Sequence, residues 1–192
     1  MIHHEIRQET PFDVVRREAL LDAAFGESRF AKTAERLRED RLPAEGLSFV
    51  AVAAGRLVGT LRLWNVAAGP GRKALLLGPL AVDGEVRDRG IGGAMMEHAL
   101  GEARRRGHAA VLLVGDAPYY GRFGFSAEKT GALWLPGPYA RDRLLAQEIA
   151  PGALDGARGL IAANGRRKGL RRLKSGVAAP AAGDSALASH AA

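Results

Sequence analysis

The stretch LGPLAVDGEVRDRGIGGAMMEHALGEARRRG, Leu77 to Gly107, joins an apolar, strand-like segment to a long amphipathic run through a charged turn. Residues 90–107 carry apolar side chains at intervals of three and four, which predicts a helix that ends at the basic RRRG cluster. Gly90, Gly92 and Gly93 stand where this helix begins. A backbone without side chains at a helix N-terminus allows a ligand to approach closely, so this junction is the candidate binding site.

Outward from this stretch, the chain alternates segments of strand and helix character. Strands are expected at 4–9, 47–66 (folded back at Ala54–Gly55), 72–83, 109–115, 132–136 and 143–152, and helices at 11–26, 29–40, 90–107 and, as a short helix or turn, 116–125. This order predicts an α/β body with a mixed sheet. Gly78–Pro79 interrupts the central strand, and a proline there predicts a bulge or a broken ladder.

Composition places the chain among globular proteins. Its 192 residues are 47% hydrophobic, which is enough to bury a core. No apolar run reaches the roughly 18 residues of a membrane span, and the polar start MIHHEIRQE does not read as a signal peptide, so we expect a cytoplasmic protein. The sequence contains no cysteine, which excludes disulfides, thiolate metal sites and a cysteine nucleophile. The histidines lack the spacing of metal ligands, and no metal is expected.

The net charge of +7 comes from the C-terminal region. Seven basic residues and no acidic residue lie between Gly156 and Gly183, whereas the other 21 basic residues match 21 acidic ones. We therefore expect residues 1–155 to form the domain, and residues 156–192 to be a disordered tail, first basic and then rich in Ala, Gly, Pro and Ser. The alternative is an arm for nucleic acid or the ribosome, whose binding would be electrostatic because no aromatic residues interleave with the charges.

Two common phosphate-binding motifs do not fit the glycine-rich turn. A Walker A loop ends in Gly-Lys-Ser/Thr, which is absent. The dinucleotide fingerprint requires a third glycine where Met95 stands, and its ribose-binding acid is also missing, since Asp116 comes too late. A turn that binds no ligand remains the structural alternative.

The pattern Arg87-x-x-Gly90-x-Gly92 at a strand-to-helix junction resembles motif A of the GNAT superfamily, the acetyl-CoA-dependent N-acetyltransferases. The resemblance continues in the bulged strand LGPLAVD and in the segment YGRFGF, which begins at Tyr120 and is similar to the family pattern Tyr-x-x-x-Gly-Phe. It covers roughly residues 3–150. It implies a GNAT-like mixed, mostly antiparallel sheet of about six or seven strands, splayed into a V and flanked by about four helices.

The resemblance also implies the cofactor and its contacts. Acetyl-CoA would place its diphosphate on the free N–H groups of the helix N-terminus and its pantetheine arm along the bulged strand. The implied contact residues come from the strand end, the turn, the first helical turn and a later aromatic cluster: Leu80, Ala81, Val82, Arg87, Asp88, Arg89, Gly90, Ile91, Gly92, Gly93, Ala94, Tyr119 and Phe123. A backbone N–H near Ala81 or Val82 would stabilise the oxyanion.

The implied reaction is direct attack of an amine on the thioester, with coenzyme A leaving. Tyr120 holds the tyrosine position of the motif and is the candidate acid for the thiolate, although a slip of one residue would give the role to Tyr119. Asp116 is the candidate general base, and it is equally placed to cap the short helix that follows. Glu27, Glu45 or a water chain to solvent are the other options.

The acceptor is expected to be a primary amine of a small molecule or a protein. Glu27, Arg29 and Arg62 are the candidates for the edge of its pocket, and they do not name a metabolite. The bulged strand contains no carboxylate, which favours one alternative, a non-catalytic module that senses acyl-CoA. Members of the superfamily often pair, so a homodimer is one expected assembly.

Overall fold

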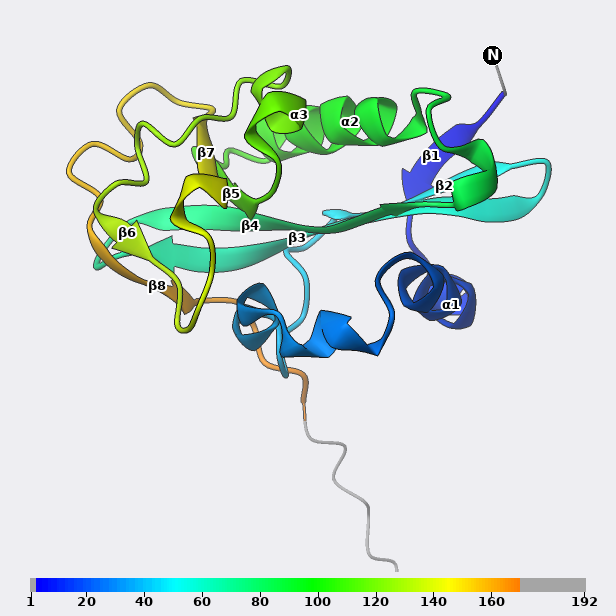
Figure 1. The fold of residues 1–192 in the computed structure, drawn as a ribbon, viewed down its shortest axis with the longest axis horizontal. Coiled ribbons are helices and arrows are strands. Elements are labelled where there is room, and N and C mark those ends of the chain that lie inside the picture. The colour runs from blue at the N-terminus through cyan, green and yellow to red at the C-terminus, as the bar shows by residue number, and fades with distance from the viewer. Residues whose placement is uncertain (1–2, 170–192) are drawn as a thin grey trace, which may run out of the picture.

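The computed structural model describes residues 3–169, and the strands of this part form one mixed sheet (Figure 1). The strands are β1 (Glu5–Gln8), β2 (Ser48–Ala53), β3 (Arg56–Ala68), β4 (Lys73–Val82), β5 (Ala110–Val114), β6 (Leu133–Trp134), β7 (Leu144–Glu148) and β8 (Gly159–Ala163). Their order is β1-β2-β3-β4-β5-β7, and β8 pairs with both β3 and β6. The pairs are antiparallel except β4–β5 and β6–β8, so the mostly antiparallel sheet implied by the family resemblance is confirmed.

Helices cover both faces of this sheet. The helix α2 (Ile91–Arg105) and the short α3 (Ala117–Gly121) lie on one face, and α1 (Val14–Phe25) lies on the other, together with the 3-10 turns at Glu27–Ala31 and Thr33–Leu37 (Figure 1). Three α-helices occur in the described residues, against about four expected. The helix expected at 29–40 is wrong: Lys32 is extended, with φ −66° and ψ 135°, and divides the segment into two 3-10 turns. Thr33 bonds to the carbonyl of Pro138, so a tertiary contact competes there with helix propensity.

The main core lies between α2 and the central strands. The helix buries Ile91, Met95, Met96, Ala99 and Ala103, at the three- and four-residue spacing that the sequence predicts. A Cβ built on Gly59 of β3 would lie 2.7 Å from the Met95 sulfur, so the absence of a side chain there lets α2 approach the sheet closely.

The bulge predicted at Gly78–Pro79 is confirmed. Leu63 of β3 pairs with Leu77 and Leu61 pairs with Leu80, so β4 has one residue more than β3 over this interval. The Gly78–Pro79 peptide is cis.

The strands β4 and β5 pair only at Leu75–Val111 and Leu76–Leu112. Beyond that point β5 keeps its pairing with β7 as far as Val114, while β4 continues alongside β3. We call the gap between residues 77–82 and residues 113–114 the β4–β5 fork. It is the V-shaped splay that the family resemblance implies.

The sheet extends past residue 155, where the tail was expected to begin. The strand β8 buries Ile161 and pairs with the end of β3, and the Leu42 N–H donates to the carbonyl of Arg166 at 2.8 Å. The expected boundary is therefore too early, because the apolar residues after Gly159 pair with the end of β3, beyond the part that pairs with β2. The remainder of the expected tail, residues 170–192, lies outside the described residues. Within residues 3–169, no helix has both the length and the apolar character needed to cross a membrane.

Candidate active site

A pocket of about 800 Å³ opens at the β4–β5 fork. Its walls are the bulge of β4 (residues 77–80), the end of β5 with the start of α3 (113–120), the 3-10 turns near residues 29–38, and the segment 135–143. Each wall comes from a different part of the chain. The pocket therefore forms only in the folded chain, at the point where β4 and β5 separate.

The N-terminus of α2 lies beside this fork and presents free backbone donors. The N–H groups of Ile91, Gly92 and Gly93 have no acceptor among the described residues, and Gly90 supplies no capping side chain. Gly90 has a left-handed φ of 82°, which a residue with a side chain rarely adopts, and Asp88 has a φ of 64°. Arg87, Asp88 and Arg89 are exposed. An anion can therefore reach the helix end, where unpaired N–H groups and the helix dipole favour it.

Gly92 also brings the end of β4 and α3 close to this helix end. A Cβ built on Gly92 would lie 3.1 Å from the hydroxyl oxygen of Tyr119 and 3.5 Å from Cγ2 of Val82. Gly93 faces Phe123, with 3.8 Å from its Cβ position to the ring, and Gly90 faces open space. The end of β4, the start of α2 and the aromatic residues Tyr119 and Phe123 are thus neighbours in the fold. These are the segments that were expected to bind one cofactor.

The free edge of β4 faces the fork at alternate residues. The Asp83 N–H donates to the carbonyl of Val58 on β3 at 2.8 Å, so the backbone of Ala81 also faces β3. By the same alternation, the N–H groups of Leu80 and Val82 face away from β3, toward the fork. Of the two backbone donors named for the oxyanion, Val82 has the suitable orientation.

Tyr120 packs over the end of β5. A Cβ built on Gly115 would lie 2.1 Å from Cε2 of Tyr120, so the ring occupies the space that a side chain at residue 115 would fill. The ring makes edge contacts with Tyr119 and Phe125, at centroid distances of 4.9 and 6.1 Å. Burial, with a smaller contribution from Tyr119, raises the pKa of Tyr120 to about 12, and Arg143 opposes the rise. The phenol therefore remains protonated at neutral pH.

Asp116 borders the pocket and caps α3. Its Oδ2 accepts a hydrogen bond from the Tyr119 N–H at 3.1 Å, while Oδ1 has no hydrogen-bond partner among the described residues. The capping role weighed in the sequence analysis is thus present. Glu27 and Glu45, the other candidate bases, are exposed and do not line the pocket.

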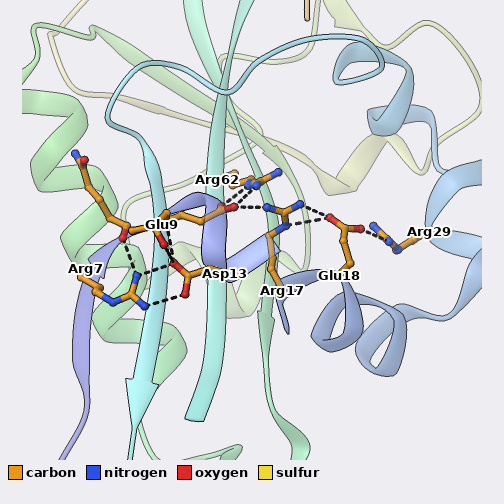
Figure 2. Close-up of polar contacts among 9 residues, drawn as sticks. Arg7, Glu9, Asp13, Arg17, Glu18, Arg29 and Arg62 are labelled. Atoms are coloured by element: carbon orange, nitrogen blue, oxygen red, sulfur yellow. Dashed lines mark hydrogen bonds and ion pairs between the residues drawn. The ribbon is translucent and has the colours of Figure 1, made fainter. Parts of the chain in front are cut away.

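The two arginines expected at the pocket edge belong to one chain of ion pairs (Figure 2). Arg62 pairs with Glu9, Glu9 with Arg17, Arg17 with Glu18, and Glu18 with Arg29. Arg17 and Glu9 are both buried at the centre of the chain, with 6% of each side chain exposed. Arg29 lines the pocket and Arg62 does not, so Arg62 serves to tie β3 to α1.

Four charged residues of the pocket were not expected there from the sequence: Lys32, Glu35, Arg38 and Arg143. Arg38 is only 8% exposed, and its Nη2 lies 2.9 Å from Oε2 of Glu35. Burial lowers the pKa of Arg38; Glu35 opposes this effect, and Arg29 adds to it. The segment RFAKTAERLRED reads as a helix with solvated charges, so no signal in the sequence could show that Arg38 is buried.

The described residues contain no cluster of three or more His, Cys, Asp or Glu side chains that could hold a metal ion.

Comparisons with known proteins agree with this arrangement. Residues 5–127 match the model of the acetyltransferase (GNAT) domain. The chain is 31% identical over 157 residues to the uncharacterized N-acetyltransferase YhbS of Escherichia coli K12, which covers 81% of this chain and 93% of that protein.

Two solved structures are similar over most of this chain. The crystal structure of E. coli YhbS in complex with CoA is 29% identical, with a TM-score of 0.73 over 85% of this chain and 91% of that one. A GNAT family acetyltransferase from Brucella melitensis in complex with acetyl-CoA is 26% identical, with a TM-score of 0.64 over 85% and 97%. With the family model matched over most of the domain and the forked sheet in place, the chain belongs to the GNAT acetyltransferase family.

Proposed function

We propose that this acetyltransferase moves the acetyl group of acetyl-CoA to a primary amine by direct attack. One observation carries the proposal: the β4–β5 fork opens a pocket that has the free N-terminus of α2 beside it and Tyr120 on its wall. The cofactors named for the Brucella and E. coli structures support the choice of acetyl-CoA.

The described residues fit this cofactor. The unpaired N–H groups of residues 91–93 would hold the diphosphate, and each hydrogen bond to a charged oxygen contributes about 1.5–3 kcal/mol. The exposed Arg87 and Arg89 add positive charge at the same turn. The free edge of β4 at Leu80 and Val82 would pair with the amide groups of the pantetheine arm, and the thioester would then lie in the fork. Bound in this way, acetyl-CoA supplies an activated acyl group and a leaving thiolate.

Tyr120 would stabilise the leaving thiolate. With a pKa raised to about 12, its phenol stays protonated, so a donor is always available. A free thiol has a pKa of about 8.5, so full proton transfer from the phenol is uphill by about 3.5 pKa units. Tyr120 would therefore act mainly as a hydrogen-bond donor while charge develops on sulfur.

Asp116 would accept the proton that the amine must lose, directly or through water. An alkylammonium has a pKa of about 10.4, so the amine is mostly protonated at neutral pH and cannot attack in that form. The free Oδ1 of Asp116 borders the pocket. Asp116→Asn separates this role from capping, since asparagine is as good an N-cap as aspartate. We expect unchanged stability and a loss of kcat/KM; unchanged kcat/KM would leave Asp116 a cap alone.

The test of the transferase activity combines binding with turnover. Calorimetry should show that acetyl-CoA binds, and an amine panel should release free thiol. Tyr120→Phe should lower kcat by about 100-fold, a typical effect of one catalytic proton donor, and change the acetyl-CoA Kd less than about twofold. Tyr139→Phe is the matched control, because Tyr139 lines the same pocket but donates its hydroxyl to the Leu133 carbonyl at 3.3 Å.

The outcomes separate the candidate functions. Binding of acetyl-CoA with no thiol release from any amine would indicate the non-catalytic sensor. No binding at all would reject the transferase and the sensor together.

A further inference from the structure

We propose that the acceptor amine carries a carboxylate and that Arg38 binds it inside the pocket. This inference rests on the proposed transferase function, because it names the substrate class of the same site.

Arg38 has hydrogen-bonding capacity that the fold does not use. Its only polar partner among the described residues is Glu35, which contacts Nη2. The Nε atom is buried without any partner. A guanidinium carries five N–H donors, and burying it with most of them unpaired costs free energy. Arg38 is 92% buried and lines the pocket, so a ligand in the pocket would supply the hydrogen-bond partner that its donors lack.

The position of Arg38 matches the geometry of the reaction. A Cβ built on Gly78 would lie 3.7 Å from Nη1 of Arg38, so this free edge of the guanidinium lies beside the bulge of β4. Gly78 lines the same pocket as Tyr120. An acceptor whose carboxylate rests on Arg38 would therefore have its amine held near the fork, where the thioester is expected.

The charge balance of the pocket favours an anionic group. Four cationic side chains and two carboxylates line it, a formal net charge of +2: Arg29, Lys32, Arg38 and Arg143 against Glu35 and Asp116. Glu18 and Asp22 neutralise Arg29 from outside the lining, so the other charged groups of the lining carry a formal net charge of +1. No ion pair joins Lys32 or Arg143 to a carboxylate in the described part of the chain. This field attracts an acceptor with a negative group and repels polyamines that carry several cations.

The charge of the site favours a carboxylate over a phosphate. Glu35 already contacts one side of the Arg38 guanidinium. The small net charge of the lining suits a singly charged group that accepts two N–H bonds better than a phosphate, which carries about two charges. The acceptor class is therefore an amino acid or another small amine with a carboxylate within reach of the same pocket.

The experiment compares amino acids with their own amides. Each pair differs in the carboxylate, and the amide has the lower amine pKa, so the comparison is biased against the expected result. Thiol release should show kcat/KM at least about tenfold higher for the acids. A preference for the amides, or for aminoalkyl phosphates over amino acids, would overturn the carboxylate assignment.

Variants connect this preference to Arg38. Arg38→Met should lower kcat/KM for the acids by about 10- to 100-fold and leave that for the amides within about threefold. Arg36→Met is the matched control, because Arg36 is exposed, lies outside the pocket, and donates to the Pro136 carbonyl at 2.7 Å. If Arg38→Met does not fold, Arg38→Lys keeps the buried charge beside Glu35 but loses the paired N–H donors of the guanidinium. The ratio of kcat/KM for the acids to that for the amides should then fall about tenfold. An unchanged ratio in a folded Arg38 variant refutes the proposal.

A binding measurement distinguishes failure of this inference from failure of the proposed function. Amino acids should bind by calorimetry to the protein saturated with CoA, and Arg38→Met should abolish that binding. Carboxylate binding without any thiol release would reject the transferase and keep the site. Thiol release from amines with no advantage for the acids would keep the transferase and reject the site.

Discussion

Replacing Gly115 by alanine tests whether the position of the Tyr120 ring controls acetyl transfer. The new Cβ would lie 2.1 Å from Cε2 and 2.5 Å from Cδ2 of Tyr120, and 3.0 Å from Cδ1 of Leu113. Ordinary contact begins near 3.4 Å, so the ring must move by about 1.3 Å. A displacement of about 1 Å at a group that contacts the reacting atoms can cost about 100-fold in rate. We expect kcat to fall by that factor and the acetyl-CoA Kd to change less than about twofold.

The matched control is Gly121→Ala on α3, where a new Cβ meets no atom within 4 Å. Its kcat should stay at the wild-type value in the thiol-release assay. The double variant Gly115→Ala/Tyr120→Phe gives the sharper result. If Gly115 acts only through Tyr120, the double variant should be no slower than Tyr120→Phe alone. A further loss of rate in that background, or full activity of Gly115→Ala, would refute this reasoning.

Three other perturbations follow from the structure. Gly92→Asp places a carboxylate at the free end of α2 and should abolish the rise in melting temperature that acetyl-CoA causes. The control is Gly101→Asp on the same helix, which should keep this rise because no atom lies within 4 Å of its new Cβ. A retained rise in Gly92→Asp would argue against the diphosphate site. The Arg7 guanidinium donates to both carboxylate oxygens of Asp13, at 2.7 and 2.8 Å, and holds the pKa of Asp13 well below its usual range. A carboxyl whose pKa is lowered by folding stabilises the folded state at pH values above its unfolded pKa, near 3.9, and this stabilisation is lost as the pH falls. Asp13→Asn should therefore lower the free energy of unfolding in urea by about 1–3 kcal/mol at pH 7 and by much less at pH 2. An equal loss at both pH values would contradict this. Since burial raises the pKa of Tyr120 to about 12, the pH–rate profile should show no loss from phenol ionisation below about pH 10, and a phenolate absorbance titration that assigns Tyr120 a midpoint near 10 would disagree.

Much of the fold follows from local patterns in the chain. The three- and four-residue spacing after Gly90 was enough to predict α2, and Gly78–Pro79 was enough to predict the bulge of β4. The segment 29–40 was predicted incorrectly as one helix because its helical composition competes with contacts to residues 136–138, about 100 positions away. The strand β8 was missed for a similar reason, since five residues have little strand signal until β3 offers an unpaired edge.

The same division applies to the site. Glycines at a helix start and a tyrosine motif after the next strand depend on backbone conformation and sequence spacing, so the sequence alone was sufficient to identify the family and to predict where its site lies. The partners of the charged residues could not be found in that way. Arg62 was expected at the acceptor pocket and instead pairs with Glu9, while Arg38, which was not expected there, lines the pocket. Coulomb energy and burial depend on three-dimensional distance, so only the folded arrangement of α1, the 3-10 turns and β3 could determine which charges are paired and which face the pocket.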